Sequence, residues 1–248
     1  MNKKYREKIK KNKNRPLKRI VLKISGEAFG TKEKPLQKNK IAYLTEEIAR
    51  IKNSELIIVP GGGNILRGKD LEPENYKGDD ADYLGMLSTI YNAVTLKNAL
   101  EVAGIKSVVF SQLKVEKITV PYSPQNCLRK LVTGSAAIIA CGTGKPGVTT
   151  DTAAALRALE LNADLIIKAT KVNGVYSADP ETNKNAVFFP HLTYRQAIEK
   201  NLKVCDQTAL ALLKNSGIKF MVLNIFKKNN LEKAAAGVCP GTVIVGDG

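Results

Sequence analysis

Short hydrophobic runs alternate along this chain with longer segments in which apolar residues recur every three to four positions. The runs predict strands over residues 20–25, 55–60, 107–111, 136–141, 165–170, 219–225 and 242–246. The periodic segments predict helices over residues 39–52, 83–103, 152–162, 206–216 and 229–236. Because strand–helix alternation implies βαβ units, we expect an α/β fold with three αβα layers around a central, mostly parallel sheet.

Positive charge is concentrated at the amino terminus. The 248 residues carry a net charge of +16, and residues 1–19 hold ten Lys or Arg against one Glu, so this stretch supplies +9 and the remainder +7. A like-charged block without a hydrophobic pattern is typical of a disordered extension, which we expect over residues 1–18, followed by a single domain over residues 19–248. An arm that contacts RNA is the alternative, but the mildly basic body does not favour nucleic acid as a partner.

The sequence lacks the features of membrane, secreted and histidine-dependent proteins. No uncharged apolar run approaches the ~18 residues that span a bilayer, and none follows the charged start, so we expect a cytoplasmic protein. The four cysteines form no CxxC pair and are expected to be reduced thiols. His191, the single histidine, excludes a histidine-based metal cluster and disfavours a Ser-His-Asp triad.

Two lysines interrupt strands that otherwise have a buried pattern. Lys23 lies near the end of the first strand, and Lys168 lies near the end of the strand over residues 165–170. A buried ammonium group is costly unless an anion meets it, and α/β sheets bind ligands at the carboxyl ends of their strands. The two lysines therefore predict one anionic ligand. Asp206, at the start of a predicted helix, is either a helix cap or a carboxylate that holds the lysines in place.

Two glycine-rich loops follow predicted strands. Glycines at residues 61–63 allow backbone N–H groups to approach phosphate oxygens, and Arg67 adds a charged fork. The second loop, GTGKPGVTTD over residues 142–151, contains GxGxxG before a predicted helix, and its Thr-Thr-Asp end either caps that helix or binds phosphate. A dinucleotide site requires an acidic residue ~20 positions later, where the chain has lysines instead, so only an NADP site remains as that alternative.

The segment NGVYSADP, residues 173–180, combines a turn, an aromatic ring and a carboxylate. These groups suit the base and ribose of a nucleotide. The chain has neither the GxxxxGK[ST] pattern of a P-loop nor the HRD and DFG motifs of protein kinases, so its phosphates require a different glycine-rich design.

Six motifs in order resemble the amino acid kinase superfamily, and within it the bacterial uridylate (UMP) kinases. They are LKISGE, VPGGGNILRG, DYLGMLSTIYN, GTGKPGVTTD, KATKVNGVYSADP and LKVCDQTA. The resemblance extends from Arg19 to the carboxyl terminus. It implies ATP-dependent phosphorylation of UMP to UDP with Mg²⁺, a step of pyrimidine nucleotide biosynthesis. It also implies a homo-oligomer, a hexamer, of a kind often regulated by GTP and UTP.

The resemblance implies a role for each matching position. Lys23 and Lys168 would stabilise the transferring phosphoryl group, with Asp206 and Asp151 orienting them. The implied ATP contacts are Lys23, Ile24, Ser25, Gly26, Gly63, Arg67, Thr170, Tyr176 and Asp179. The implied UMP contacts are Gly62, Asp82, Thr143, Gly144, Lys145, Pro146, Gly147, Val148, Thr149 and Thr150. The acceptor-binding part would span roughly residues 19–160, and the ATP-binding part roughly residues 161–248.

The chain departs from the family pattern at three places. Lys145 stands where a small polar residue is usual, Gly147-Val148 replaces a bulkier pair, and Asn173 replaces an aspartate. Lys145 is a candidate contact for the acceptor phosphate. A kinase for an amino acid, carbamate or another small acid is the alternative within the superfamily, although the helix that begins near Asp82 favours a nucleotide.

Overall fold

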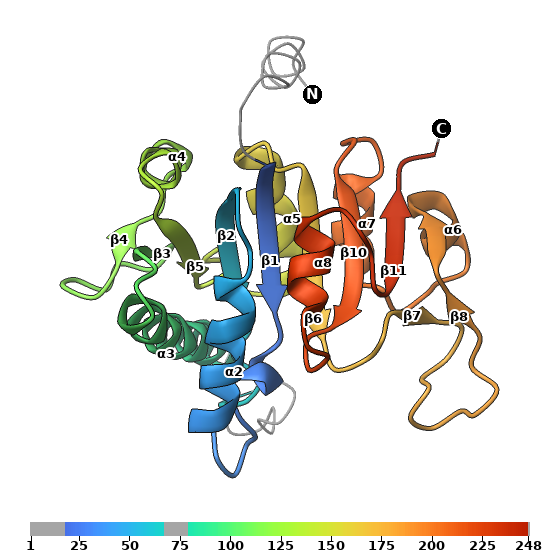
Figure 1. The fold of residues 1–248 in the computed structure, drawn as a ribbon, viewed down its shortest axis with the longest axis horizontal. Helices are drawn as coiled ribbons and strands as arrows, with labels where there is room; N and C mark the ends of the chain where they lie inside the picture. Colours follow the sequence, from blue (N-terminus) through green and yellow to red (C-terminus); the bar gives the residue numbers. More distant parts are fainter. Residues whose placement is uncertain (1–17, 67–78, 248) are drawn as a thin grey trace.

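The computed structural model describes residues 18–66 and 79–247, which form a nine-stranded sheet, a two-stranded sheet and helices on both faces of the larger sheet (Figure 1). Most of the expected basic extension lies outside the described residues. Lys18, its last predicted residue, is the first residue of strand β1. Within the described part of the chain, no helix has the length and the low charge that crossing a bilayer requires.

The large sheet confirms the predicted α/β class. Its strand order is β4-β3-β5-β2-β1-β6-β10-β11-β9, and of its pairings only β10 with β11 is antiparallel among the described residues. A small antiparallel pair, β7 and β8, lies beyond one edge. The bounds are β1 Lys18–Ile24, β2 Ser54–Pro60, β3 Ser107–Ser111, β4 Val120–Pro121, β5 Ala136–Ala140, β6 Leu165–Thr170, β7 Val175–Tyr176, β8 Phe188–Phe189, β9 His191–Thr193, β10 Lys219–Asn224 and β11 Thr242–Val245.

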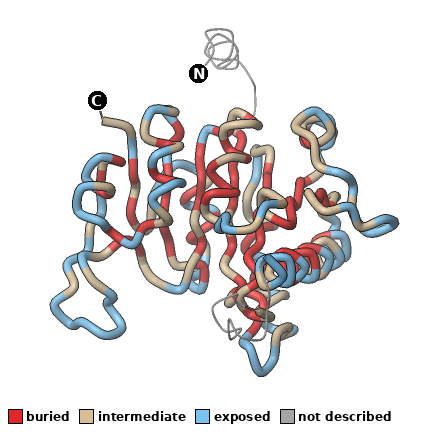
Figure 2. The backbone as a smooth tube through the Cα atoms, turned by 180° about the vertical axis from the view of Figure 1, so that it is seen from behind, coloured by how far each residue is buried: buried red, intermediate tan, exposed pale blue. Residues whose placement is uncertain are grey.

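The helices form two layers that enclose the sheet. The alternation of side chains along β1 divides the core, because Ile20 and Leu22 pack with α2, α3 and α8, whereas Val21 packs with α4, α5, α6 and α7. The central strands are therefore buried on both faces (Figure 2). The bounds are η2 Gly26–Ala28, α2 Lys38–Ala49, α3 Asp80–Val102, α4 Pro124–Val132, α5 Thr150–Glu160, α6 Tyr194–Glu199, α7 Gln207–Leu213 and α8 Asn230–Ala235.

All seven predicted strands and all five predicted helices are present, with their ends displaced by a few residues. The strand predicted over residues 136–141 ends at Ala140, because Cys141 has a left-handed backbone with φ of 60°. The helix predicted over residues 206–216 ends at Leu213, shortly before Gly217 with φ of 75°. The prediction missed α4, α6 and the short strands β4, β7, β8 and β9.

Candidate active site

Strand register brings the two predicted lysines together. Lys23 of β1 and Lys168 of β6 are direct Cα partners in the parallel pairing of these strands. Each follows, by two residues, a side chain that packs in the core beneath α5 and α7, so both lysines project on that face. Both strands end within two residues of the lysine. The ammonium groups therefore lie at the carboxyl edge of the sheet, where α/β folds bind ligands.

Asp151, in the first turn of α5, is the carboxylate that pairs with both lysines. Its Oδ1 lies 3.0 Å from Lys23 Nζ, and its Oδ2 lies 2.6 Å from Lys168 Nζ. Lys168 also donates to the carbonyl oxygen of Val204 at 2.7 Å. One carboxylate thus serves two ammonium groups, and this cluster keeps an excess positive charge.

The electrostatics of this cluster follow from burial and from the shared carboxylate. Burial lowers the pKa of Lys23, and the attraction of Asp151 offsets only part of that effect. Burial opposes ionisation of Asp151 as well, but the two ammonium groups outweigh it and lower its pKa. A second anion at this position would be attracted, because the single carboxylate of Asp151 does not neutralise the charge of both lysines.

Asp206 lies at the start of α7 and has other partners. Its Oδ1 accepts hydrogen bonds from the Thr152 hydroxyl at 2.6 Å and from the Ala209 N–H at 2.9 Å, and its Oδ2 accepts one from the Thr149 hydroxyl at 2.5 Å. Burial would raise the pKa of Asp206, but these three bonds lower it. Asp206 is therefore a helix cap that also fixes the start of α5. Among the described residues, the ion pairs of the two lysines are with Asp151.

The first glycine-rich loop packs tightly against η2 and α3. A Cβ added at Gly26 would lie 2.7 Å from the backbone nitrogens of Gly63 and Asn64, and one added at Gly62 would lie 2.7 Å from Ser88 Cβ. Side chains larger than hydrogen do not fit at either position. The neighbouring Ser25 Oγ is buried and has no hydrogen-bond partner in the described part of the chain. Such a hydroxyl is a donor that a phosphate oxygen would satisfy.

A buried pair of asparagines, which the sequence reasoning did not single out, supports this loop. Asn64 and Asn92 exchange side-chain hydrogen bonds of 2.7 and 3.1 Å. Asn92 also donates to the Gly61 carbonyl oxygen at 2.7 Å, and Asn64 donates to that of Pro35 at 2.7 Å. The sequence did contain a signal for this pair, because Asn92 is a polar residue at a position of the long helix where the pattern predicts burial.

The second glycine-rich loop, residues 141–149, joins β5 to α5. Gly142, Gly144 and Gly147 have φ of 51°, 75° and 73°, conformations that favour glycine. Asp82, in the first turn of α3, accepts a hydrogen bond from the Gly147 N–H at 2.6 Å. Asp82 thus lies against this loop. Lys145 is exposed on the loop.

The predicted base and ribose residues line a separate pocket of about 610 Å³. Tyr176 and Asp179 contribute to it, together with Asn201 and Lys203 from the segment before α7. The Tyr176 ring packs against Phe188, with centroids 5.2 Å apart. Lys171 Nζ lies 2.6 Å from Glu181 Oε2, an ion pair that ties the end of β6 to the loop around Asp179. The volume and the mixture of aromatic and polar groups suit a nucleoside.

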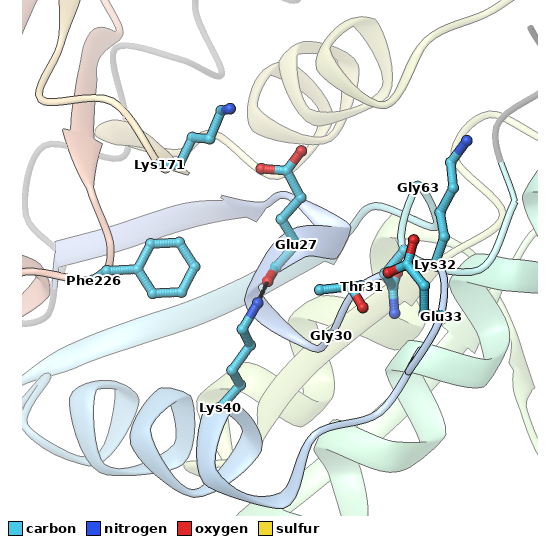
Figure 3. A pocket seen from close by; sticks show the side chains of 10 residues that line it. Glu27, Gly30, Thr31, Lys32, Glu33, Lys40, Gly63, Lys171 and Phe226 are labelled. Carbon is cyan, nitrogen blue, oxygen red and sulfur yellow. Dashed lines mark hydrogen bonds between the residues drawn. The ribbon is translucent and has the colours of Figure 1, made fainter. Parts of the chain in front are cut away.

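A smaller pocket of about 430 Å³ lies beside Gly63 and is shown in Figure 3. Lys40 donates to the Glu27 carbonyl oxygen at 2.9 Å, and its ammonium lies 5.6 Å from the centroid of the Phe226 ring. Of the predicted site residues that the structure describes, only Gly63 lines this pocket. Neither Lys23 nor Lys168 lines it.

The remaining predicted residues are distributed along the same edge of the sheet. Ile24 is buried and accepts a hydrogen bond from Gly61 N–H at 2.8 Å, which ties β1 to the first loop. The Thr170 carbonyl oxygen accepts one from Ile225 N–H at 2.9 Å. Asn173 accepts one from the Asn224 side chain at 3.2 Å. Arg67 lies outside the described residues.

Comparison with known proteins identifies the wider group to which this architecture belongs. Residues 18–224 match the amino acid kinase family. Two bacterial crystal structures are similar over nearly their whole length. UMP kinase from Ureaplasma parvum has a TM-score of 0.87 and 36% identity, over 92% of this chain and 99% of that one. UMP kinase from Bacillus anthracis has a TM-score of 0.88 and 31% identity, over 94% and 98%.

An archaeal structure is also similar. Uridylate kinase from Archaeoglobus fulgidus has a TM-score of 0.73 and 28% identity, over 91% of this chain and 99% of that one. Each of the three similar structures thus covers more than nine-tenths of this chain.

Proposed function

Since this chain belongs to the amino acid kinase family, we propose that it transfers the γ-phosphoryl group of ATP to UMP, giving ADP and UDP. The observation that carries the proposal is the pair Lys23 and Lys168, adjacent at the carboxyl edge and sharing the single carboxylate of Asp151. The similar UMP kinases from two bacteria and an archaeon support UMP as acceptor. The reaction belongs to pyrimidine nucleotide synthesis in the cytoplasm.

The lysine pair supplies the electrostatic part of catalysis in this proposal. Phosphoryl transfer requires little covalent chemistry from the protein, which has to align the two substrates and neutralise charge on the oxygens of the transferring group. Lys23 and Lys168 act on those oxygens. Asp151 keeps the two ammonium groups apart and oriented, and Asp206 positions the start of α5, from which Asp151 projects.

ATP lies along the carboxyl ends of β1, β2 and β6. Its phosphates meet the backbone of Ile24, Ser25, Gly26 and Gly63. The Ser25 hydroxyl, which has no partner among the residues that the structure describes, donates to one phosphate oxygen. Its base and ribose occupy the 610 Å³ pocket with Tyr176 and Asp179, beyond Thr170. The ATP-binding part, roughly residues 161–248, thus supplies the pocket for base and ribose, whereas the phosphate contacts come from the loops after β1 and β2. Arg67 is part of this proposal by resemblance.

UMP lies on the side of β5 and α3, within residues 19–160. Asp82 accepts hydrogen bonds from the sugar or the base of UMP. It does not contact the phosphate, because the carboxylate and the phosphate are both anions and repel each other. The acceptor contacts proposed with it are Gly62, Thr143, Gly144, Lys145, Pro146, Gly147, Val148, Thr149 and Thr150. Gly62 packs directly against α3, since a Cβ there would lie 2.7 Å from Ser88 Cβ, so the first loop and α3 lie together on this side.

Mg²⁺ accompanies ATP in this proposal, and the donor set of the protein is compatible with that arrangement. In the described residues, no group of three or more His, Cys, Asp or Glu side chains forms a metal cage. Mg²⁺ usually binds substrate phosphates and waters with few protein ligands. When bound, the ion supplies further neutralisation of the phosphate oxygens.

We also propose that the chain forms a homo-oligomer, a hexamer by resemblance. Helix α3 supports self-association, because Tyr83, Leu84, Leu87, Tyr91 and Val94 are between 36% and 55% exposed. These positions fall within an arc of about 100° on one side of the helix. The opposite side of α3 is already buried in the core, so a second copy of the chain would cover the side that the fold leaves exposed. Analytical ultracentrifugation of the purified chain tests the assembly.

A panel assay tests the proposed function directly. ADP release is measured with ATP and, in turn, UMP, CMP, dUMP, aspartate or carbamate. Turnover with UMP supports the proposal, whereas turnover restricted to aspartate or carbamate favours the small-acid alternative. ADP release with none of these acceptors contradicts the proposal.

Two further measurements address the remaining alternatives. NADP binding without ATP turnover would favour the reductase alternative. Tight, salt-sensitive RNA binding that disappears when residues 1–18 are deleted would favour the RNA-binding alternative. The kinase proposal expects full UMP turnover after that deletion.

A further inference from the structure

A buried arginine reaches from α5 to the base of the second glycine-rich loop. Arg157 is only 4% exposed, although it carries a full charge. Its Nη2 donates to the carbonyl oxygen of Gly142 at 3.1 Å, and its Nη1 lies 2.5 Å from Glu160 Oε2. Its guanidinium also lies over the Tyr122 ring, 4.2 Å from the centroid. The proposed function does not use this residue.

The surroundings of Arg157 hold its fork in one orientation. The Tyr122 hydroxyl donates to the same Glu160 oxygen at 2.7 Å, so ring, carboxylate and guanidinium form one unit. A guanidinium presents several donors in a rigid plane, whereas an ammonium group is a point donor. Only the planar fork contacts Glu160 with one nitrogen while it contacts Gly142 with another.

The contacted carbonyl belongs to a strained part of the loop. Cys141 and Gly142 both have left-handed backbones, with φ of 60° and 51°, and a non-glycine residue in that region costs about 1–2 kcal/mol. The Cys141 N–H donates to Thr89 Oγ1 at 2.8 Å, and Arg157 donates to the Gly142 carbonyl oxygen at 3.1 Å. Two side chains from different helices thus fix the 140–141 and 142–143 peptide units, which flank the 141–142 peptide where the chain leaves β5.

The orientation of the Gly142 carbonyl determines that of the next amide. The carbonyl of Gly142 and the N–H of Thr143 belong to one planar trans peptide and point in opposite directions. Because Arg157 draws the carbonyl toward α5, the Thr143 N–H points away from Arg157. Within the described residues this N–H has no hydrogen-bond partner.

We propose that Arg157 is a positioning residue that fixes the Gly142–Thr143 peptide so that the Thr143 N–H faces the acceptor nucleotide. This inference rests on the proposed function, in which residues 143–150 bind UMP. Arg157 itself touches neither substrate. Its loss leaves the lysine pair and the ATP pocket in place and disturbs the acceptor side.

The test compares Arg157→Lys with Tyr122→Phe. The lysine variant keeps the charge but loses the fork, and the phenylalanine variant removes a hydroxyl from the same cluster without touching the loop. We expect Arg157→Lys to raise the KM for UMP about tenfold, the effect of losing a hydrogen bond from a charged donor, and to leave the KM for ATP within about twofold. Tyr122→Phe keeps the ring beneath the guanidinium and the Arg157–Glu160 ion pair, so both KM values should stay within about twofold of wild type.

Hydrogen–deuterium exchange gives a readout that does not depend on activity. We expect faster exchange in a peptide covering residues 142–149 of Arg157→Lys, and wild-type exchange in Tyr122→Phe. Arg157→Gln, which keeps an amide donor but loses the charge, serves as the second variant if the lysine variant does not fold, and its KM for UMP should rise by about three- to tenfold.

The outcomes separate this inference from the proposed function. An unchanged KM for UMP with unchanged loop exchange overturns the role of Arg157. So does an equal rise of both KM values together with a lower melting temperature, because that is the signature of a merely structural residue. If the wild-type protein does not phosphorylate UMP, the proposed function fails, and the exchange comparison alone then decides whether Arg157 holds the loop.

Discussion

Each end of strand β1 buries a cationic side chain, but the two cations differ in whether they share their carboxylate with another cation. At the amino end, Arg19 is 5% exposed, and its guanidinium nitrogens lie 2.7 and 2.6 Å from Glu55 Oε2. It also donates to the Leu161 carbonyl oxygen, and its backbone N–H donates to Asp164 at 2.8 Å. At the carboxyl end, Lys23 shares the single carboxylate of Asp151 with Lys168.

The difference distinguishes a charge that the fold compensates from one that it compensates only in part. Arg19 has a carboxylate and a carbonyl of its own, so its donors are used within the fold. The lysine pair has one carboxylate for two cations, and a buried excess charge is unfavourable until an anion compensates it. We therefore expect a phosphate site where the surroundings leave part of a buried positive charge uncompensated. The presence of a buried cation is not sufficient.

Replacement of Lys23 should give the largest effect. An ammonium group ~4 Å from a phosphate oxygen contributes about 4 kcal/mol at an effective dielectric near 20, so we expect Lys23→Met to lower kcat by roughly 10²- to 10³-fold. The variant should fold normally, because Lys168 and Asp151 then form a balanced pair. Steady-state kinetics and thermal unfolding measure the two quantities. Retention of more than about a tenth of wild-type kcat would reject the catalytic role.

Arg19→Met is the matched control at the other end of the strand. It leaves Glu55 buried without its cation, so the free energy of unfolding should fall by about 3 kcal/mol while the folded fraction keeps its kcat. Denaturant unfolding and active-site titration measure the result. If both variants lost the same property, the distinction between the two ends of β1 would not hold.

Asp206→Asn tests whether the start of α5 needs a charged acceptor. The amide still accepts the bond from Ala209, so the fold should persist, but Thr149 and Thr152 lose the carboxylate to which they donate. We expect kcat to fall more than tenfold with little change in the KM for ATP. A variant with near-normal kcat would leave Asp206 as a helix cap alone.

Acid should weaken the lysine cluster in a direction set by Asp151. Its pKa in the folded protein is lower than its ordinary value of 3.8, because the two lysines outweigh the effect of burial. Its contribution to stability is therefore complete above pH 3.8 and is lost as the pH falls through the lower value. Chemical unfolding between about pH 2.5 and 5 should show a smaller acid-induced loss of stability in Asp151→Asn than in the wild type. Equal slopes for the two proteins would contradict the assignment.

Lys145→Ala should give the smallest effect, because the side chain is exposed and its charge is screened by water. If Lys145 contacts the acceptor phosphate, the KM for UMP should rise about two- to fivefold while kcat is unchanged. The measurement is made at low and moderate ionic strength, and the rise should shrink as salt is added. An unchanged KM for UMP refutes the contact.

The sequence pattern was sufficient for most of the fold. Buried strands of a parallel sheet have nearly continuous apolar sequences. Lys23 and Lys168 could be singled out because each is a charged residue within such a sequence. Two missed helices had signals that were available. Ser123 accepts a bond from Asn126 at the start of α4, with Pro124 in its first turn, and Thr193 forms a capping box with Gln196 in α6. Their short lengths hid the helical period.

The residues of the candidate site were easier to predict from the sequence than the contacts between them. Asp151 and Asp206 both begin helices, and spacing along the chain does not say which one meets the lysines. That depends on how far α5 and α7 extend over the edge of the sheet. Arg157 has an ordinary place in a helix sequence, and its contact with Gly142 exists only because the loop adopts left-handed backbone conformations.

The position of β1 between β2 and β6 has a consequence for biosynthesis. β2 is complete at residue 60, but β6 emerges about a hundred residues later, ~5–20 s at ordinary rates of translation. Until then one edge of β1 offers unpaired peptide groups to any other nascent strand, a known route to aggregation. The event that covers this edge also sets Lys168 beside Lys23, so the edge of β1 is closed and the cation pair is assembled in the same step, while the open edge moves to β6 until β10 is made.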